Sequence, residues 1–321
     1  MRYVILGAGA VGGVLAATLA RSGSDVTVVA RGENLEAIER GGLRLITPTG
    51  ESLIDVAAVS SLESASLESG DVLIVAVKGQ DTLGPLRALA RQAPRDLFVV
   101  CAQNGVENER VALRLFANVY GMCVMTPATH LEPGVVVVHA APEPGVFDLG
   151  RWPGGVDDCA ENIAADIRSG GAFANARADI ATLKWGKLLS NVHNAHEALV
   201  GEVARDSVLA RLTREEATAA MRAAGVDVDG AIAAARERFG LLQHGSVAEA
   251  PRSGGSSWQS LTRGSGDIEA DFLNGEIVLL GRLYGVATPV NEMLQRRANE
   301  AAAAHRAPGS LSEDDLMAEL A

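Results

Sequence analysis

The sequence predicts an α/β fold in two domains, a doubly wound parallel sheet over residues 1–175 and an all-helical domain over residues 176–321. Three observations lead to this prediction. Short apolar runs alternate with helical patterns through the first half of the chain, a glycine-rich turn follows the first run, and helical patterns fill the second half. A length of 321 residues also favours two domains over one.

Short runs rich in Val, Ile and Leu are typical of strands buried on both faces of a parallel sheet. Five such runs are Tyr3–Leu6, Val26–Ala30, Val72–Val77, Leu97–Cys101 and Val119–Val124. Three segments between them have helical length and spacing, namely Val11–Arg21, Asp81–Gln92 and Glu107–Phe116. This alternation indicates a Rossmann domain. We expect two further runs, Val135–His139 and Val146–Leu149, to add antiparallel strands at the edge of the sheet.

From about Asn175 onward the apolar spacing is helical. The expected helices are Asp179–Val200, Leu212–Ala224, Val228–Phe239, Glu269–Tyr284 and Pro289–Ala304. Pro289 suits the first turn of a helix, where its missing N–H would have no intrahelical acceptor. The segment His244–Ser257 is rich in Gly and Ser and is expected to be a loop, either a flexible connector or a mobile segment of an active site.

The composition narrows the class of protein. A formal net charge of −12 argues against a general nucleic-acid surface, which needs a basic face. The cysteines lack metal-ligand spacing, so we expect no metal site and buried thiols of a reduced, cytoplasmic protein: Cys101, Cys123 and Cys159. The amino terminus runs directly into a strand, and no apolar stretch reaches the roughly 18 to 20 residues that span a bilayer. We therefore expect a soluble protein.

The glycine-rich turn predicts a dinucleotide site. It follows a strand and opens a helix, whose N-terminal N–H groups are suited to binding a pyrophosphate. Its residues are Gly7, Ala8, Gly9, Ala10, Val11 and Gly12. The first glycine permits a tight turn, the second the approach of phosphates, and the third close packing of helix on strand. The alternative is a glycine-rich turn in an α/β fold that binds no cofactor.

The end of the second predicted strand favours NADP over NAD. An NAD site usually has an acid there to bind the ribose 2′-hydroxyl, whereas this strand is followed by Arg31. A guanidinium can hold a 2′-phosphate through two charge-assisted hydrogen bonds. The alternative is that Arg31 is a solvated loop residue.

Two more loops leave the carboxyl ends of predicted strands, where open α/β sheets bind their ligands. One carries Lys78 and the other carries Asn104, which is followed by Gly105. Their positions favour a cofactor or substrate role over the alternatives of a surface charge and a simple turn.

A helix in the second half of the chain is expected to carry a polar face. Lys187, Asn191 and Asn194 are spaced i, i+4 and i+7 and so share one side. Apolar residues are expected to pack beside that face: Leu183, Leu188, Leu189 and Val192. A later segment, Gly266–Gly275, places acids and an amide at a helix start. Acids are common there because the positive end of the helix dipole stabilises them. From residue chemistry alone, each of the two segments can be either a solvent-exposed polar face or the wall of a cleft.

Together these segments resemble the ketopantoate reductase (2-dehydropantoate 2-reductase) family over essentially the whole chain. The shared features are the Gly7–Gly12 turn, Arg31, Lys78, Asn104-Gly105, Trp185-Gly186-Lys187-Leu188 with Asn191, Ser256-Ser257 and Glu269-Ala270-Asp271-Phe272-Leu273-Asn274-Gly275. The glycine motif is generic, whereas the lysine–asparagine helix and the late Glu-x-Asp-x-x-Asn-Gly segment are much more specific.

The resemblance implies a role for each matching residue. Lys187 resembles the family's catalytic general acid and Glu269 its substrate-hydroxyl-binding carboxylate, and the substrate-orienting groups are Asn104, Asn191 and Ser257. The resemblance further implies a Rossmann domain joined to a helical domain, with the active site in the cleft between them. The implied reaction is the NADPH-dependent reduction of 2-dehydropantoate to (R)-pantoate, on the route to pantothenate and coenzyme A. The residues expected to bind NADP are Gly7–Gly12, Arg31, Lys78 and Asn104.

One position departs from the family's pattern. Many members place a second asparagine eight residues after the catalytic lysine, but here Ala195 occupies that position and Asn194 precedes it. One residue turns a helical side chain by about 100°. A different small 2-keto acid is therefore an alternative substrate. A non-catalytic NADP-binding sensor is a second alternative, although a sensor needs neither Lys187 nor Glu269. Apolar helices in the second domain are compatible with a homodimer.

Overall fold

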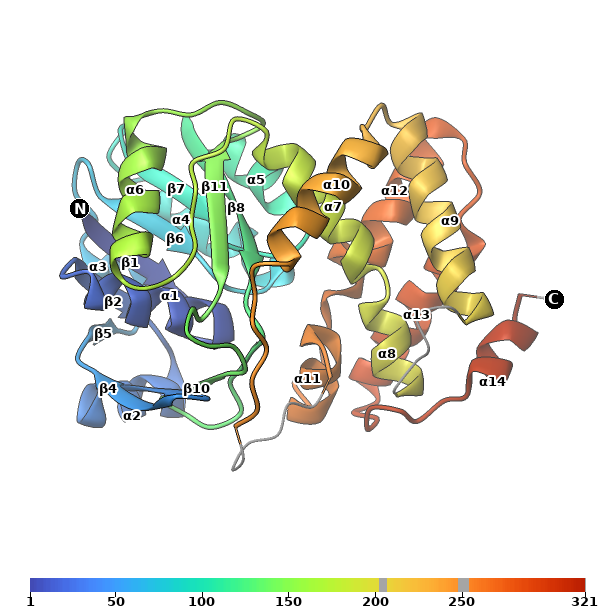
Figure 1. Ribbon diagram of the computed structural model, residues 1–321, viewed down its shortest axis with the longest axis horizontal. Coiled ribbons are helices and arrows are strands. Elements are labelled where there is room, and N and C mark those ends of the chain that lie inside the picture. Colours follow the sequence, from blue (N-terminus) through green and yellow to red (C-terminus); the bar gives the residue numbers. More distant parts are fainter. Residues whose placement is uncertain (202–206, 248–253, 321) are drawn as a thin grey trace. The chain divides into compact units, whose positions relative to one another are not determined.

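The computed structural model describes residues 1–201, 207–247 and 254–320, which form two compact units (Figure 1). The first comprises Met1–Gln103, Glu107–Ala181 and Arg236–Arg252, and the second Asn104–Val106, Thr182–Ala235 and Ser253–Ala321, as far as these ranges are described. The predicted α/β class, a parallel sheet followed by a helical region, is confirmed. The predicted boundary between residues 175 and 176, which would separate two independently folding domains, stays a prediction.

A seven-stranded sheet is the centre of the first unit, in the order β11-β8-β7-β6-β1-β2-β5. Its strands are β1 (Arg2–Leu6), β2 (Asp25–Val29), β5 (Ala57–Val59), β6 (Val72–Val75), β7 (Phe98–Cys101), β8 (Asn118–Met125) and β11 (Val146–Arg151). All neighbours run parallel except β11, the predicted antiparallel edge strand. The strand order reverses between β1 and β6, so their carboxyl ends form the topological switch point.

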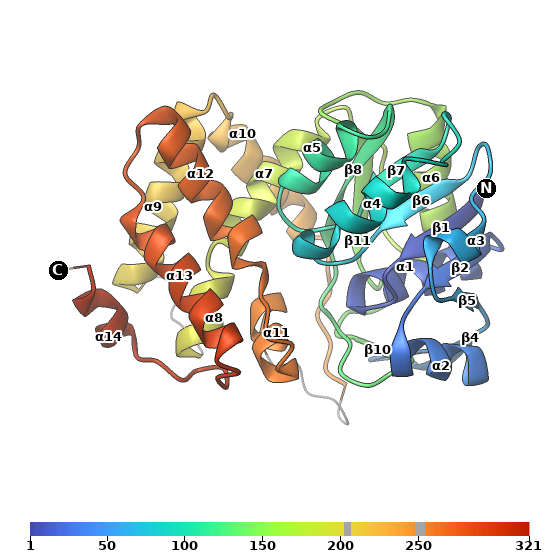
Figure 2. The ribbon, with the colours of Figure 1, turned by 180° about the vertical axis from the view of Figure 1, so that it is seen from behind.

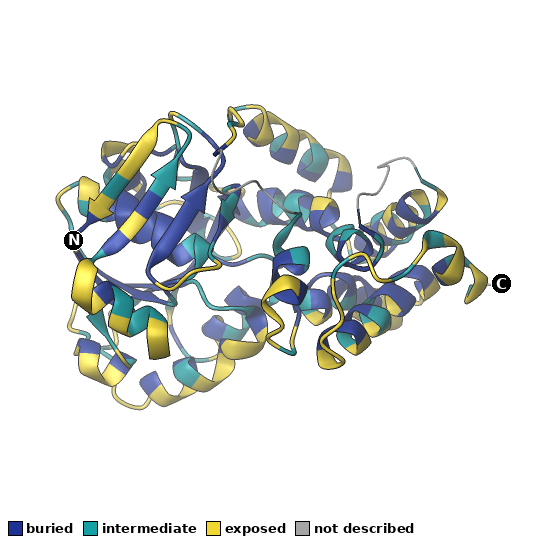
Figure 3. Cartoon of the chain, turned by 90° about the horizontal axis from the view of Figure 1, so that it is seen from below, coloured by how far each residue is buried: buried dark blue, intermediate teal, exposed yellow. Residues whose placement is uncertain are grey.

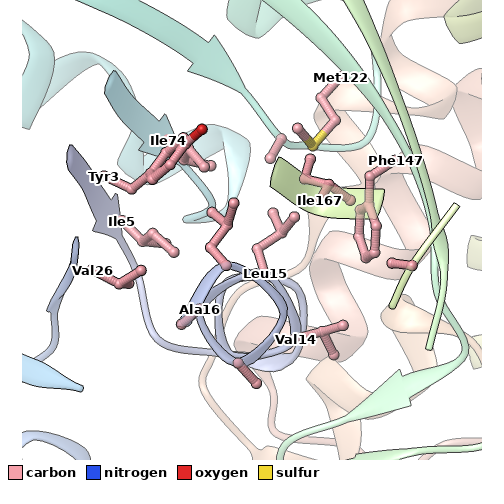
Figure 4. Packing of buried hydrophobic residues seen from close by; sticks show 14 of the residues in the cluster. Tyr3, Ile5, Val14, Leu15, Ala16, Val26, Ile74, Met122, Phe147 and Ile167 are labelled. Atoms are coloured by element: carbon pink, nitrogen blue, oxygen red, sulfur yellow. The ribbon is translucent and has the colours of Figure 1, made fainter. Parts of the chain in front are cut away.

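Helices cover both faces of this sheet. Tyr3 and Ile5 of β1 join one core, and the residues between and after them join the other, because side chains alternate along a strand. Helices α1 (Ala10–Arg21) and α6 (Asp158–Ser169) cover the first core, where Figure 4 shows Leu15 and Ile167. The second is covered by α3 (Leu62–Ala65), α4 (Leu83–Leu89) and α5 (Glu107–Leu113), and α4 and α5 are seen in Figure 2.

The helix predicted over Asp81–Gln92 is shorter in the structure. A 3-10 helix, η1 (Gly79–Asp81), precedes α4, which starts at Leu83. Pro85 lies in the first turn of α4, where a proline is tolerated, but its ring would clash with the carbonyl of residue 81 in a continuous α-helix. The proline therefore separates the two helical segments.

A second, four-stranded sheet lies in the same unit, in the order β4-β3-β10-β9. Its strands are β3 (Leu43–Thr47), β4 (Gly50–Ile54), β9 (Ala128–Thr129) and β10 (Val135–Val138). The prediction that residues 135–139 extend the edge of the main sheet was wrong, because β10 pairs with β3 in this second sheet and runs parallel to it. Helix α2 (Gly32–Gly41), which precedes β3, was not predicted.

Helices follow one another from Ile180 onward. They are α7 (Ile180–Asn191), α8 (Asn194–Val200), α9 (Val208–Ala223), α10 (Val228–Phe239), α11 (Ser256–Arg263), the 3-10 helix η2 (Glu269–Phe272), α12 (Asn274–Tyr284), α13 (Pro289–Ala303) and α14 (Glu313–Ala318). Figure 3 shows the long helices buried on one side and exposed on the other. Helix α10 has the predicted bounds, and Pro289 starts α13 as predicted.

The helix predicted over Asp179–Val200 is two helices. Nδ2 of Asn274 donates to the carbonyl oxygen of Val192 at 2.9 Å. A continuous helix would use that oxygen to accept from the backbone N–H of residue 196. The capture of this carbonyl by a side chain accounts for the end of α7 at Asn191 and the fresh start of α8 at Asn194.

Of the predicted loop His244–Ser257, residues 248–253 lie outside the described residues, and α11 already begins at Ser256.

None of the described helices is long and apolar enough to cross a membrane. All three cysteines are buried thiols, as expected.

Candidate active site

Two glycines of the turn after β1 are required by the protein's own packing. Gly7 has φ +102°, a left-handed value that favours glycine, and an added Cβ would lie 2.8 Å from Cγ1 of Val77. At Gly12 an added Cβ would lie 1.8 Å from the carbonyl oxygen of Gly7. Helix α1 therefore packs directly on the turn that precedes it.

The middle glycine meets a different requirement. Gly9 has φ −82°, and an added Cβ there would meet no described atom within 4 Å. Gly9 is the N-cap of α1, and no side chain of the described residues caps this helix start. The space beside Gly9 is thus open, and the first N–H groups of α1 have no intrahelical acceptor, an arrangement that suits a pyrophosphate.

A pocket of about 430 Å³ adjoins this turn at the switch point of the sheet. Arg31, an exposed residue with an extended backbone, is the N-cap of α2 and contributes to the pocket wall. The pocket is lined by Leu6, Gly7, Ala8, Val29, Ala30, Arg31, Asn34, Val77, Gln80, Asp81, Gly84 and Pro85. The predicted cofactor residues Gly7, Ala8 and Arg31 therefore line one pocket, of a size typical for small-molecule ligands.

A buried amide network fixes the loops that follow β6 and β7. Gln103 is buried, and its Nε2 donates to the carbonyl oxygen of Val77 and to Oγ1 of Thr82, both at 2.7 Å. Oγ1 of Thr82 donates in turn to Oδ1 of Asn108 at 3.0 Å. Lys78 follows Val77 and is half-buried. The sequence did not predict this network, which holds the segment that carries Lys78.

Three of the predicted site residues meet in the second unit. Nζ of Lys187 donates to Oδ1 of Asn104 at 3.0 Å, and Nδ2 of Asn191 donates to the same oxygen at 3.2 Å. Both donors lie on α7, one turn apart. Asn104 belongs to the tripeptide Asn104–Val106, which is compact with the second unit. Lys187 is half-buried and Asn191 is buried, so one amide oxygen orients an ammonium group that is partly shielded from water.

The loop that carries Asn104 also touches the late polar segment. Gly105 has φ +78°, and an added Cβ would lie 2.7 Å from the carbonyl oxygen of Phe272, the last residue of η2. Glu269, the predicted hydroxyl-binding carboxylate, is the first residue of the same short helix and is half-buried. Glycine at position 105 thus permits the close approach of the Asn104 loop to η2.

Ser257 lies in the first turn of α11 and is only 2% exposed. Within the described chain its hydroxyl has no hydrogen-bond partner. A buried hydroxyl without a partner costs free energy unless a ligand or water supplies one. The start of α11 is held by α8, since the N–H of Gly255 donates to Oε2 of Glu197 at 3.1 Å and Nδ2 of Asn194 donates to Oγ of Ser256 at 3.2 Å.

Comparison with known proteins assigns the chain to a family. The family model described as ketopantoate reductase PanE/ApbA matches residues 3–154, and the model of its C-terminal part matches residues 179–302. A 2-dehydropantoate 2-reductase from Archaeoglobus fulgidus is 34% identical over 311 residues, which covers 91% of this chain and 95% of the relative. The chain belongs to the ketopantoate reductase family. Its members are 2-dehydropantoate 2-reductases and related dehydrogenases, oxidoreductases that act on CH–OH groups.

Other relatives agree with this assignment. A 2-dehydropantoate 2-reductase from Mesorhizobium japonicum is 31% identical over 319 residues and covers 90% of this chain and 94% of the relative. The crystal structure of a PanE/ApbA family ketopantoate reductase from Ralstonia eutropha JMP134 has a TM-score of 0.77 and 29% identity, covering 95% of this chain and 99% of the other. D-mandelate dehydrogenase, solved with NADH and anilino(oxo)acetate, shares the fold at 22% identity and a TM-score of 0.78, with 95% and 99% covered.

One predicted feature of the ketopantoate reductase site was wrong. Asn194 does not share a helical face with Lys187, because α7 ends at Asn191 and Asn194 is the first residue of α8. Its amide contacts α11, as described above. Ala195, at the position where many family members have asparagine, is buried in the core of the second unit.

Two polar residues of the family's late segment hold the helical unit together. Oδ1 of Asp271 accepts from Nε2 of Gln295 and from Nδ2 of Asn299, both at 2.7 Å, and so ties η2 to α13. Asn274 is fully buried and, besides holding Val192, donates to Oδ1 of Asn291 at 3.0 Å. Asp271 and Asn274 therefore stabilise the helical unit, and the substrate role of Glu269 stays a prediction.

Proposed function

We propose that this member of the ketopantoate reductase family reduces 2-dehydropantoate to (R)-pantoate with NADPH in the cytoplasm, a step toward pantothenate and coenzyme A. The observation that carries the proposal is the ammonium of Lys187, held at 3.0 Å by Oδ1 of Asn104 while Asn191 donates to the same oxygen. The 2-dehydropantoate 2-reductases of A. fulgidus and M. japonicum support the choice of substrate.

Reduction of a 2-keto acid adds a hydride to the keto carbon and a proton to its oxygen. NADPH supplies the hydride when it is bound. Lys187 donates the proton, and its positive charge stabilises the negative charge that develops on the oxygen. Asn104 directs the ammonium by accepting its hydrogen bond, and Asn191 keeps the oxygen of Asn104 in place by donating to it.

The remaining proposed contacts orient the substrate. The hydroxyl of Ser257, buried and without a described partner, donates to the carboxylate of the 2-keto acid. Glu269 accepts a hydrogen bond from the hydroxyl group at the far end of 2-dehydropantoate. Such contacts lower the entropic cost of reaching the reactive geometry, because they hold the keto carbon in one orientation.

The cofactor residues fit a nicotinamide dinucleotide with a 2′-phosphate. The open space beside Gly9 and the uncapped start of α1 suit the pyrophosphate. Arg31 lines the adjoining pocket at the end of β2, and the guanidinium suits a phosphate where a carboxylate would repel it. Lys78 and Asn104, in the loops after β6 and β7, complete the proposed set.

The alternative within this family is reduction of a different small 2-keto acid. It is favoured by Ala195, which supplies no amide where many members have one, and by the use of Asn194 to hold α11. A non-catalytic NADP-binding sensor would need neither the Lys187–Asn104 contact nor Glu269. The homodimer stays a prediction.

The test is turnover, followed as NADPH absorbance, with 2-dehydropantoate and a panel of other 2-keto acids. We expect 2-dehydropantoate to be the best substrate, and Lys187→Ala to lower kcat by about 10²–10⁴-fold with little change in NADPH affinity. Lys187→Arg keeps the charge but donates protons poorly, so it should rescue little. Ser190→Ala, at an exposed position on the same helix, is the matched control.

Activity confined to other 2-keto acids would show that 2-dehydropantoate is not the substrate, while the proposed mechanism would stand. NADPH binding without turnover of any acid would favour the sensor, and a Lys187→Ala enzyme as fast as the wild type would remove Lys187 from the chemistry.

A further inference from the structure

Asn34 joins three parts of the cofactor domain through one carboxamide. It lies in the first turn of α2, three residues after Arg31. Its Nδ2 donates to the carbonyl oxygen of Ala8 at 3.1 Å, and its Oδ1 accepts from the N–H of Gly134 at 2.7 Å. The amide therefore connects the glycine turn, the start of α2 and the segment that leads into β10.

The segment around Gly134 is itself fixed. The carbonyl oxygen of Gly134 accepts from the N–H of Arg44 in β3 at 2.9 Å. Gly134 has φ +73°, and an added Cβ would lie 3.0 Å from Cβ of Ala37 on α2. Because this segment is anchored to the second sheet and packs against α2, its hydrogen bond to Asn34 holds the first turn of α2 in a defined place.

The consequence concerns Arg31. Its guanidinium is at the end of a flexible side chain, and its backbone position is set by the start of α2, of which it is the N-cap. The hydrogen bond from Asn34 to Ala8 fixes this helix start relative to the turn proposed to bind the pyrophosphate. The spacing between a pyrophosphate on the turn and a 2′-phosphate at Arg31 therefore depends on Asn34.

We propose that Asn34 is a positioning residue that sets the preference for NADPH over NADH by holding Arg31 at the right distance from the glycine turn. This inference rests on the proposed use of NADP. Asn34 also lines the pocket, but both ends of its amide already bond to backbone groups. These bonds orient the amide within the protein, so we assign Asn34 a positioning role through Arg31 and not the role of the ribose-binding acid of NAD sites.

The test measures the dissociation constants of NADPH and NADH for the full-length protein and compares their ratio. Asn34→Ala removes both hydrogen bonds, so we expect the preference for NADPH to fall by about tenfold or more while NADH affinity changes little. Partial unfolding would weaken both cofactors equally and leave the ratio unchanged. The ratio therefore separates positioning from a merely structural role.

Asn34→Asp is the second variant, in case Asn34→Ala does not fold. A carboxylate can still accept from Gly134, but it cannot donate to Ala8 and it places a negative charge near the proposed phosphate. We expect the same loss of NADPH preference. Glu39→Ala, at an exposed position of α2, is the matched control and should leave the ratio as in the wild type.

Arg31→Ala distinguishes the two levels of the proposal. If Arg31→Ala leaves the ratio unchanged, the proposed NADP use itself is wrong. If Arg31→Ala abolishes the NADPH preference but Asn34→Ala and Asn34→Asp retain it, NADP use stands and the positioning role of Asn34 is overturned.

Discussion

At the scale of single residues, the Gly7–Gly12 turn contains glycines with two different purposes. Gly12 is forced by packing, because a Cβ there would overlap the carbonyl oxygen of Gly7. Gly9 has a backbone conformation open to any residue and faces empty space in the described chain. Stability and cofactor binding should therefore respond separately to substitution at these positions.

We expect Gly9→Ala to leave the thermal midpoint unchanged or slightly higher, because alanine restricts the unfolded chain by about 0.4–1 kcal/mol. Its methyl group occupies the space proposed for the pyrophosphate, so NADPH affinity should fall at least tenfold, roughly the loss of one good contact. Gly12→Ala should lower stability by about 1–3 kcal/mol, as overpacking does. Calorimetric unfolding and NADPH titration measure the two effects. A Gly9→Ala protein that binds NADPH normally would contradict the proposed phosphate position.

Local chemistry explains which site residues the sequence could predict. The glycine turn and the lysine and asparagine of α7 are recognised by the spacing of residues only a few positions apart, so they can be predicted from the sequence. Asn34 is different for two reasons. Its partner Gly134 is 100 residues away in the chain, and Asn34 lies in the first turn of α2, a helix that the sequence pattern did not predict. Its role appears only when the backbone partners of its amide are known.

At the scale of elements, periodicity predicted helices better than it predicted their interruptions. The apolar spacing continues from Leu188 through Val192 to Ala195 and Leu199, all of them buried, so the pattern reads as one helix. The break between α7 and α8 depends on Asn274, far along the chain, which captures the carbonyl oxygen of Val192. Similarly, β10 has a strand-like sequence, but its partner β3 could not be read from it.

Helix α8 also buries a group whose charge should control stability. His196 is 1% exposed, and its Nε2 lies 3.5 Å from Oε2 of Glu313, the first residue of α14. Burial lowers the pKa of His196, and the nearby Glu313 carboxylate only partly opposes this shift. The native state therefore holds His196 neutral at a pH where the unfolded chain, with a histidine pKa of about 6.5, is protonated.

This difference sets the sign of a pH dependence. Below about pH 6.5 the unfolded state binds more protons than the native state at His196, so the free energy of unfolding falls as the pH falls, until the native pKa is reached. We expect His196→Gln, which cannot titrate, to flatten denaturant-derived stability between about pH 7 and about pH 5. His305→Gln, at an exposed histidine, is the control. Identical slopes for His196→Gln and the wild type would contradict this account.

At the scale of the whole molecule, the sequence predicted one crossing between two domains, whereas the chain crosses several times. Residues 104–106 are compact with the second unit, and residues from Arg236 onward return to the first. A pattern of strands followed by helices cannot reveal such a return, because the last turn of α10 has the same helical spacing as the turns before it. Backbone hydrogen bonds join residues 243 and 245 to residues 141 and 139, and a further contact joins two side chains that are far apart in the chain.

That contact is a buried ion pair. Nη2 of Arg238 donates to Oδ1 of Asp148 in β11 at 2.7 Å, and Nε lies 2.6 Å from Oδ2. The backbone N–H of Asn175 also donates to Asp148, at 2.8 Å. Asp148 is fully buried, and although burial raises the pKa of its carboxyl group, the Arg238 guanidinium opposes this shift. A cut between residues 175 and 176 would leave the two partners on different pieces.

We therefore expect Arg238→Met to destabilise the full-length protein by about 3–5 kcal/mol, because the buried Asp148 carboxylate loses its closer guanidinium and keeps Arg177, at 4.0 Å. Combining it with Asp148→Asn should recover much of that loss, since the asparagine carries no charge and its oxygen can still accept from Asn175. Arg236→Met, at an exposed position in the same helix, should change stability little. Denaturant unfolding of the wild type, Arg238→Met, Asp148→Asn and the double variant measures the coupling, with Arg236→Met as the control. If Arg238→Met matches Arg236→Met, the return of the chain to the first unit is held by other contacts than this ion pair.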